Sequence, residues 1–324
     1  MTVARYIYND IKRIFGRYIQ NKDQNFIHPL LNKNEIVELL TRVQNIKKTS
    51  SHRHETSQDK VGEYRSVYRG HGMDYEESRR YQPGDDPRHM NWQLTARTGH
   101  HYMKVYREER QPGVFILVDR RQSMRFGTQQ RLKITQAVRT AAITAFSAQE
   151  HNLSIGGVIL DKQVKWFKES QNKQAIFDFI SQASVPAPPI YNDKNKIRLS
   201  DILPTLDSIL KKGSILYLIS DFSDINEINQ AVLLKLSSSH QVYAVQITDP
   251  AEISLPPVKA LTISSVGNKS VTINTEIKAN KENYQSASED YYEKIKKTFE
   301  DMGITYLQIL TTKNNIEQST LLNI

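Results

Sequence analysis

Short apolar runs and helix-like patterns alternate along most of this chain, and this alternation is what most constrains its fold. Strand-sized apolar runs occur at residues 114–118, 153–160, 164–167, 214–219, 241–247 and 304–309. Segments with apolar residues at helical spacing occur at 129–149, 175–183, 199–210, 227–236 and 291–302. Strands that are apolar on both faces and alternate with helices are typical of a parallel sheet covered on both sides. We therefore predict an α/β fold with a doubly wound, mainly parallel sheet.

The first part of the chain has a different pattern. Residues 1–50 predict an N-terminal helical segment, with apolar residues at helical spacing in 4–19 and again in 35–46. Residues 47–60 are polar and rich in Ser and His, which is typical of a linker or loop. We expect this linker to separate the helical segment from the rest of the protein.

The remaining residues predict two further parts. Residues 61–111 are dense in Tyr, Arg, Gly and acids, and they alternate like strands at 64–69 and 101–107. They predict a small β-rich module. Residues 112–324 contain the α/β domain, in which 255–275 are candidates to pair with that module.

The composition excludes several classes of protein. The chain has no cysteine, which excludes disulfide frameworks, thiolate metal sites and cysteine nucleophiles. No apolar run approaches the roughly 18 residues that a membrane-spanning helix needs. The first residues lack the apolar stretch of a signal peptide. We therefore expect a cytoplasmic protein without a transmembrane segment.

The formal net charge of +9 does not by itself indicate nucleic-acid binding. Residues 52–111 carry eleven basic and ten acidic side chains, whereas a nucleic-acid footprint is a patch of one sign. We find no Gly-rich phosphate loop and no nucleic-acid-binding motif. The six basic residues of 120–150, against one acid, are expected on a solvated helix face. Residues 1–50, with nine basic side chains against four acidic ones, allow a peripheral contact with an anionic membrane surface.

Two of the predicted strands end in carboxylates, Asp119 and Asp221. Sites in open α/β sheets lie outside the carboxyl ends of the strands. The phrase after the first strand reads Asp119, Arg120, Arg121, Gln122, Ser123. It is similar to the Asp-x-Ser-x-Ser motif of von Willebrand factor A domains. The resemblance implies a metal-ion-dependent adhesion site in which Asp119, Ser123 and Asp221 bind Mg²⁺, a hard cation that prefers oxygen ligands.

A longer set of residues resembles the signature of one bacterial family. The set comprises Arg69, Gly70, His71, Gly72, Asp74, Arg79, Tyr81, Pro83, Gly84, Asp85, Asp86, Arg88, Asn91, Trp92, Ala96, Arg97, Ser220, Asp221, Asp249 and Pro250. These residues are similar in type and spacing to the family called domain of unknown function 58, over residues 60–324. The resemblance implies a von Willebrand factor A-like domain fused to a small β-rich module. Members are commonly encoded beside MoxR-type AAA+ ATPases, which implies a role as adaptor or co-chaperone of such an ATPase.

One departure from the motif bears on metal binding. Arg121 stands where the motif has its first serine, so one oxygen ligand is missing, and no threonine from another loop is identified. A guanidinium beside Asp119 and Asp221 would repel a divalent ion and could neutralise both carboxylates. We therefore predict a degenerate site without a cofactor. In the alternative, Arg121 points to solvent and a weaker Mg²⁺ site survives on Asp119, Ser123 and Asp221.

The charged segment 79–97 allows two interpretations. In the structural one, four arginines pair with four acids, and two aromatic residues act as anchors. The arginines are Arg79, Arg80, Arg88 and Arg97, the acids are Glu76, Glu77, Asp85 and Asp86, and the aromatic residues are Trp92 and Tyr81. Buried charges need such partners. In the functional one, the exposed members form a docking face. The residues that we assign to partner binding are Arg121, Arg125, Asp85, Asp86, Arg88 and Trp92.

The sequence predicts a non-enzymatic protein-interaction module. It has no nucleotide-binding loop, no HExxH motif and no identifiable His base for Ser123, so we assign no catalytic residue. The alternative is a metal-dependent hydrolase that uses residues 71–101. That reaction would require His71, Asp74, Asp85 and His89 to converge in one cleft.

Overall fold

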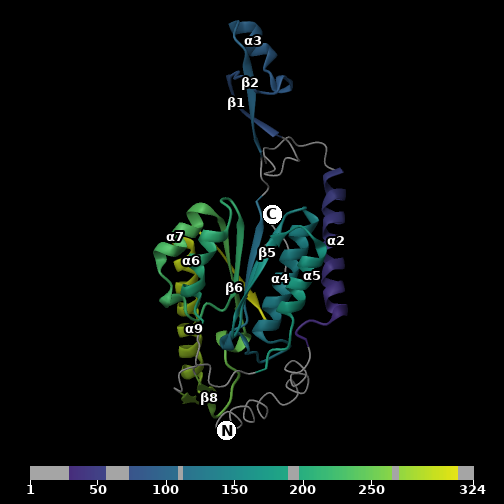
Figure 1. Ribbon diagram of the computed structural model, residues 1–324. Coiled ribbons are helices and arrows are strands. Elements are labelled where there is room, and N and C mark those ends of the chain that lie inside the picture. Colours follow the sequence, from purple (N-terminus) through teal and green to yellow (C-terminus); the bar gives the residue numbers. More distant parts are fainter. Residues whose placement is uncertain (1–28, 56–72, 109–111, 189–196, 265–269, 313–324) are drawn as a thin grey trace. The chain divides into compact units, whose positions relative to one another are not determined.

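The computed structural model describes residues 29–55, 73–108, 112–188, 197–264 and 270–312 (Figure 1). The chain divides into two compact units. One unit contains residues 1–51 and 112–324, and the other contains residues 52–111. The helix predicted at 4–19 and the strand predicted at 64–69 lie outside the described residues.

A six-stranded sheet forms the centre of the larger unit. Its strands are β3 (Val114–Asp119), β4 (Ile155–Leu160), β5 (Val164–Ser170), β6 (Ile215–Ser220), β7 (Gln241–Thr248) and β10 (Thr305–Leu310). They lie in the order β10-β7-β6-β3-β4-β5, and every neighbouring pair is parallel except β4 with β5. All residues of β3, β4 and β6 are buried, as the continuous apolar runs predicted. The predicted α/β fold with a mainly parallel sheet is confirmed.

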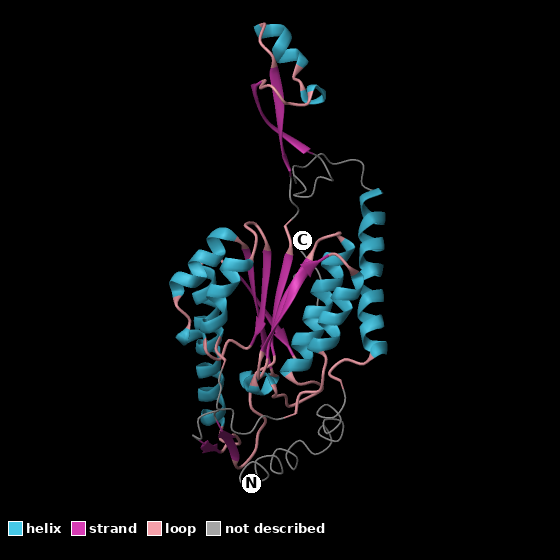
Figure 2. Ribbon diagram, viewed as in Figure 1, coloured by secondary structure: helices cyan, strands magenta, loops and turns pink. Residues whose placement is uncertain are grey.

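Helices cover both faces of this sheet (Figures 1 and 2). They are α2 (Lys33–Glu55), α4 (Lys133–Glu150), α5 (Lys173–Ala183), α6 (Leu199–Ile209), α7 (Gln230–Ser239) and α9 (Lys278–Asp301). Buried side chains of α2, α4 and α5 belong to one hydrophobic core, and those of α6, α7 and α9 belong to a second. The sheet therefore separates two cores, as in other three-layer α/β domains.

The connections reverse direction between β3 and β6. From β3 the chain continues through β4 to β5 at one edge, and from β6 it continues through β7 to β10 at the other edge. Neighbouring loops diverge at such a switch point, which is where α/β folds bind ligands. Asp119 is the last residue of β3, and Asp221 directly follows β6. The fold therefore brings these two carboxylates, which are 102 positions apart in the chain, to the same edge of the sheet.

Helix α2 corrects the predicted linker at 47–60. It extends from Lys33 to Glu55, because no Gly or Pro occurs in that stretch to end it. Its first turn is closed by a capping box: the Glu35 N–H donates to Asn32 Oδ1 at 2.9 Å, and the Asn32 N–H donates to Glu35 Oε2 at 2.9 Å. Leu39 and Val43 attach the helix to the core beside α4 and α5.

The smaller unit contains one antiparallel strand pair with a helical connection. Strand β1 (Met73–Arg80) pairs with β2 (Tyr102–Glu108), and α3 (Trp92–Thr98) lies between them in the chain. The strand expected at 101–107 is present, whereas α3 was not predicted in a module expected to be β-rich. Asn91 accounts for this helix, since its Oδ1 accepts from the Leu94 N–H at 3.2 Å and caps the first turn.

The expected pairing of residues 255–275 with the smaller unit stays a prediction. Strand β8 (Leu261–Ser264) pairs with β9 (Ser270–Ile273) in a separate two-stranded sheet. Four residues of each strand are in register, from Leu261 opposite Ile273 to Ser264 opposite Ser270. Among the described helices, none combines the length and the apolar character required to cross a membrane.

We predict that Leu39→Ala destabilises the protein by about 2–5 kcal/mol, because it leaves a cavity where a fully buried side chain packs. Val37→Ala on the same helix is the matched control. Val37 is 58% exposed, so its change is expected within about 0.5 kcal/mol. Urea unfolding of the full chain measures both values. Equal stabilities of the two variants would show that α2 does not pack on the domain.

Candidate functional site

Three loops at the carboxyl end of the sheet bring together most of the buried charged residues of the larger unit. They follow β3, β6 and β7. The first continues into the short helix η3 (Gln122–Met124), and the third into the single-turn helix α8 (Pro250–Ile253). We refer to the charged residues of these loops, with Lys133 at the start of α4, as the sheet-end site.

Arg121 binds two carboxylates at the sheet-end site. Its Nη2 lies 2.7 Å from Asp119 Oδ2, and its Nη1 lies 2.5 Å from Asp224 Oδ2. The Arg121 side chain is 14% exposed and that of Asp119 is fully buried. Such charge-assisted, multidentate pairs fix both position and orientation. The guanidinium therefore ties the loop after β3 to the loop after β6.

Asp119 receives further donors that complete its hydrogen bonding. Its Oδ1 accepts from the Arg121 backbone N–H at 2.9 Å and from the Arg121 Nε at 3.0 Å. Its Oδ2 accepts from the Ser220 hydroxyl at 2.6 Å as well as from Nη2. A carboxylate offers about four acceptor positions. All of them are in use here.

Asp221 is neutralised by a different cation from the one predicted. The Lys133 Nζ lies 2.8 Å from Asp221 Oδ2 and 2.7 Å from Glu252 Oε1. The Ser123 hydroxyl and the Ser223 N–H both donate to Asp221 Oδ1, at 3.2 Å. The expectation that Arg121 neutralises both Asp119 and Asp221 is therefore corrected. Arg121 pairs with Asp224 in addition to Asp119, and Lys133 pairs with Asp221.

Burial and neighbouring charges shift the pKa values of Arg121, Lys133 and Asp221 in opposite directions, and the neighbouring charges have the larger effect. Burial lowers the pKa of Arg121, but Asp119 and Asp224 outweigh it and raise the pKa above its ordinary value. Burial likewise lowers the pKa of Lys133, and Asp221 and Glu252 raise it more. For Asp221, burial raises the pKa, and attraction to Lys133 brings it below the ordinary aspartate value. The three groups are therefore ionised at neutral pH.

A third buried carboxylate forms no ion pair with any residue that the structure describes and is held by hydrogen bonds instead. Asp249 follows β7 and is fully buried. Its Oδ2 accepts from the Thr128 N–H at 2.8 Å and from the Thr311 hydroxyl at 3.0 Å. The Thr128 hydroxyl also donates to Oδ1, and Glu252 closes a capping box with the Asp249 N–H. Asp249 thus anchors the loops that surround the sheet-end site.

The donor set does not fit a divalent cation of the metal-ion-dependent adhesion type. A Mg²⁺ ion needs carboxylate or hydroxyl oxygens with free lone pairs. Both oxygens of Asp119 are saturated by Arg121 and Ser220, and Asp221 Oδ2 is bound to Lys133. A metal could reach either carboxylate only by displacing a fixed cation.

The residue after Asp221 has a strained backbone. Phe222 has a φ of +51°, in the left-handed region that bulky residues seldom occupy. Such a conformation costs about 1–3 kcal/mol and is found mostly at functional positions. The Phe222 ring is buried against Phe299, with ring centroids 4.7 Å apart. The conformation directs the ring into the core while the loop beyond it turns back toward Arg121.

Arg125 does not lie where we predicted a partner contact. Its side chain is 2% exposed and pairs with Asp161, to which the 1%-exposed side chain of Arg120 also binds. Both arginines donate further to backbone carbonyls within residues 182–188. They connect the loop after β4, through Asp161, to the end of α5 and the segment that follows it. The basic residues of 120–150 are thus not a solvated face, and Lys133 and Arg139 are buried as well.

The predicted residues of the smaller unit divide into internal and exposed ones. Asp85 accepts two hydrogen bonds from Arg79, at 2.6 and 2.8 Å, and one from the Gln82 N–H. Asp86 caps the short helix η2 (Pro87–His89) through the Arg88 N–H. Trp92 is 65% exposed, so it is not the buried anchor of the structural interpretation. Arg88 is exposed too.

The structure describes the side chains of two of the four residues of the hydrolase alternative, Asp85 and His89. His71 lies outside the described residues, and so does the side chain of Asp74. Asp85 uses both carboxylate oxygens for Arg79, inside its own turn. No observation on the described residues favours this alternative, which stays a prediction.

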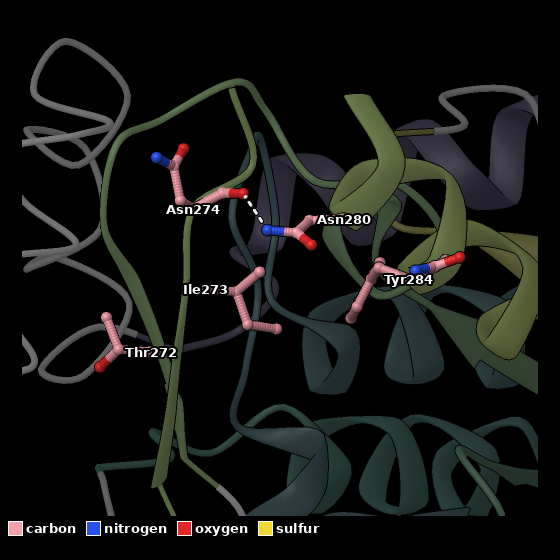
Figure 3. A pocket seen from close by; sticks show the side chains of 6 residues that line it. Thr272, Ile273, Asn274, Asn280 and Tyr284 are labelled. Atoms are coloured by element: carbon pink, nitrogen blue, oxygen red, sulfur yellow. Dashed lines mark hydrogen bonds between the residues drawn. The ribbon is translucent and has the colours of Figure 1, made fainter. Parts of the chain in front are cut away.

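A shallow pocket occurs elsewhere on the larger unit (Figure 3). Its lining residues come from β9 and the first turns of α9: Thr272, Ile273, Asn274, Asn280, Asn283 and Tyr284. The Asn280 side chain donates to the Asn274 carbonyl at 2.9 Å across it. The pocket contains no residue of the sheet-end site and, apart from the phenol of Tyr284, no ionisable group.

Sequence reasoning missed Lys133, Asp224 and Glu252. Nothing in the residues next to Glu252 indicates a cation partner. Asp224 lies three positions after Asp221, and that spacing was the one available signal for a second acid in the loop. Lys133 follows β3 by 14 residues, so only the fold brings it to Asp221.

The sequence matches a family model described as "Protein of unknown function DUF58" over residues 77–294. The chain belongs to this family. Uncharacterized proteins of Mycobacterium bovis (Mb1516) and Mycobacterium tuberculosis (Rv1480) are 29% identical over 205 residues. That alignment covers 61% of this chain and 62% of each relative, so the chain matches about three fifths of their length.

Two solved structures are similar to this DUF58 protein at low scores. One is a conserved hypothetical protein BatB from Bacteroides thetaiotaomicron, with a TM-score of 0.38, 10% identity, and coverage of 62% of this chain and 92% of BatB. The other is an aerotolerance-related membrane protein from Bacteroides fragilis, with a TM-score of 0.39, 12% identity, and coverage of 65% and 97%. No conclusion about function follows from these similarities.

We predict that Lys133→Met destabilises the protein at pH 7 by about 3–5 kcal/mol, because it leaves Asp221 buried without its cation. In the natural protein Asp221 has a lowered pKa, so its contribution is present above about pH 4, the ordinary aspartate pKa, and is lost as pH falls further. In the variant, burial still raises the pKa of Asp221, and only the hydrogen bonds from Ser123 and Ser223 oppose it. As pH falls from 7 toward 4, protonation of Asp221 then removes the unpaired buried charge that destabilises the variant.

Urea unfolding at several pH values measures this difference. The difference in unfolding free energy between the natural protein and Lys133→Met should become smaller as the pH is lowered. Lys235→Met is the control, since Lys235 is 71% exposed in a surface pair with Asp207 and should change stability by less than about 1 kcal/mol. A gap that is independent of pH would contradict the role assigned to Lys133.

Proposed function

We propose that this DUF58 protein is a non-enzymatic protein-interaction module with a von Willebrand factor A-like domain. Its partner is a MoxR-type AAA+ ATPase, for which it acts as an adaptor or co-chaperone. One docking surface is the sheet-end site, and no metal takes part in it. Dependence on an ATP-driven partner places the protein in the cytoplasm.

The observation that carries this proposal is the position of Arg121. It occupies the serine position of the Asp-x-Ser-x-Ser phrase and binds Asp119 and Asp224 at the switch point of the sheet. In the resembling domains a metal ion joins the loops at this place. A guanidinium with five fixed donors can join two carboxylates without a metal. The loops are thus pre-organised for a protein partner.

Sheet topology supports the von Willebrand factor A-like assignment. The order of strands places β3 and β6 in the middle, with an antiparallel strand, β5, at one edge. The Asp119 phrase follows β3, and Ser123 from this phrase donates to Asp221 after β6. The two halves of the resembling motif therefore meet in space, although they carry a lysine in place of a metal ion.

The charge states support binding rather than catalysis. A general acid or base works best with a pKa near the operating pH. Arg121 and Lys133 have raised pKa values and Asp221 has a lowered one, so these groups stay ionised around pH 7. Each is also committed to a partner. These three groups are fixed charges suited to recognition.

Association with the ATPase tests the proposal. The purified chain should bind the MoxR-type ATPase of the same organism in a pull-down, carried out with and without ATP. Ser223→Arg should weaken binding by about tenfold or more, because it places a large side chain at an exposed position between Asp221 and Asp224. Lys235→Gln is the control, since Lys235 lies near the end of α7 that leads into the amino end of β7. No binding by the natural chain under either condition would reject the adaptor role.

Metal independence has its own test. The thermal midpoint of the natural protein should not change with Mg²⁺. Arg121→Ser removes the cation from two buried carboxylates and should cost about 3–5 kcal/mol. The same change restores the serine of the motif, so part of this loss should be recovered on adding Mg²⁺ or Mn²⁺. Stabilisation of the natural protein by Mg²⁺ would contradict the proposal.

A further inference from the structure

The smaller unit ends in a segment that exposes aromatic side chains. Residues 78–104, which we call the tip, comprise the ends of β1 and β2 with the turn, η2 and α3 between them (Figure 1). Trp92 is 65% exposed and Tyr81 is 38% exposed. Met103 is the one buried hydrophobic side chain among the tip residues. Burial of apolar surface therefore cannot explain the ordered shape of the tip.

Hydrogen bonds hold the tip together instead. The Asn91 amide caps α3 and donates from Nδ2 to the Ser78 hydroxyl at 2.9 Å. The Asn91 N–H donates to the Tyr102 carbonyl at 2.7 Å, and the Tyr102 N–H returns a bond to Thr95 Oγ1 at 3.1 Å. These bonds fasten the helix to both strands. Because Trp92 directly follows Asn91, its backbone is fixed while its ring stays in solvent.

Both acids of the tip are used internally, and most of the cations are not. Asp85 pairs with Arg79, and Asp86 caps η2. The tip carries five Lys and Arg side chains against these two acids, a formal net charge of +3. Arg80, Arg88 and Arg97 are exposed and form no ion pair with any side chain that the structure describes. The tip thus exposes three arginines and a tryptophan within one short segment.

We propose that the tip is a docking knob in which Trp92 inserts into an acidic pocket of a protein partner, while Arg88 and Arg97, exposed on the same segment, supply positive charge. The inference rests on the proposed function, because that partner is the MoxR-type ATPase. Trp and Arg are the residues that most often dominate protein–protein binding energy. A rigid backbone under the tryptophan lowers the entropy lost on binding.

The charge of the tip and the length of α3 indicate which kind of partner the tip binds. The net positive tip requires an acidic surface, whereas Asp85 and Asp86, which we had assigned to partner binding, serve its internal structure. Helix α3 has seven residues and is therefore about 10 Å long, which suits a pocket rather than an extended nucleic-acid track. The tip and the sheet-end site belong to different units of the chain and share no residue, so each can be substituted alone.

Affinity for the ATPase, measured by fluorescence anisotropy of the labelled full chain, tests the inference. Trp92→Ala should weaken binding by about thirtyfold or more. The matched control is Trp166→Ala, which removes the other tryptophan of the chain, 41% exposed on β5, and should stay within about twofold of the natural protein. Arg88→Glu should weaken binding more than Arg88→Ala, and added salt should reduce that difference.

The outcomes separate this inference from the function on which it rests. If the natural chain binds and Trp92→Ala binds equally well, the knob is rejected and the adaptor role stands. If the natural chain does not bind, both are rejected. Binding of a single-stranded DNA oligonucleotide that depends on Trp92 would replace the protein partner with a nucleic acid and overturn the inference. Trp92→Ala should keep its thermal midpoint within about 2 °C, because the side chain is mostly exposed.

Discussion

The contact between Arg121 and two carboxylates is the constraint on which the sheet-end site depends. Asp119 is fully buried at the end of the central strand, and an isolated buried carboxylate would be strongly unfavourable. Arg121 removes that cost and at the same time binds Asp224, which carries the loop after β6. One side chain therefore compensates a charge and fixes the distance between two loops. A metal ion could join the same two loops only through ligand atoms with free lone pairs.

A second cation repeats this arrangement on the other side of the switch point. Lys133 joins Asp221 to Glu252, so α4 and α8 are linked through the loop after β6. Asp249 connects the loop after β7 to Thr128 and Thr311 by hydrogen bonds alone. The carboxyl end of the sheet is thus held by ion pairs and hydrogen bonds between buried groups. This organisation suits a preformed recognition surface, as we propose.

The two units use opposite means to obtain a defined surface. The larger unit buries its charges against two hydrophobic cores, and its exposed loops derive their geometry from that burial. The tip of the smaller unit has almost no core and relies on Asn91 and Thr95 to fasten a short helix. Its signature residues are therefore largely structural. Trp92 and the exposed arginines are what this framework presents.

The amino-acid sequence by itself determined the α/β architecture, because buried strands and amphipathic helices each leave a local, periodic pattern. It also located Asp119 and Asp221, since strand ends can be identified from the same pattern. Only the tertiary structure decided which cation meets which acid. Lys133 and Arg121 are both basic residues after β3, and nothing local distinguishes the one that pairs with Asp221. Pairing depends on distances across the sheet, which no periodicity encodes.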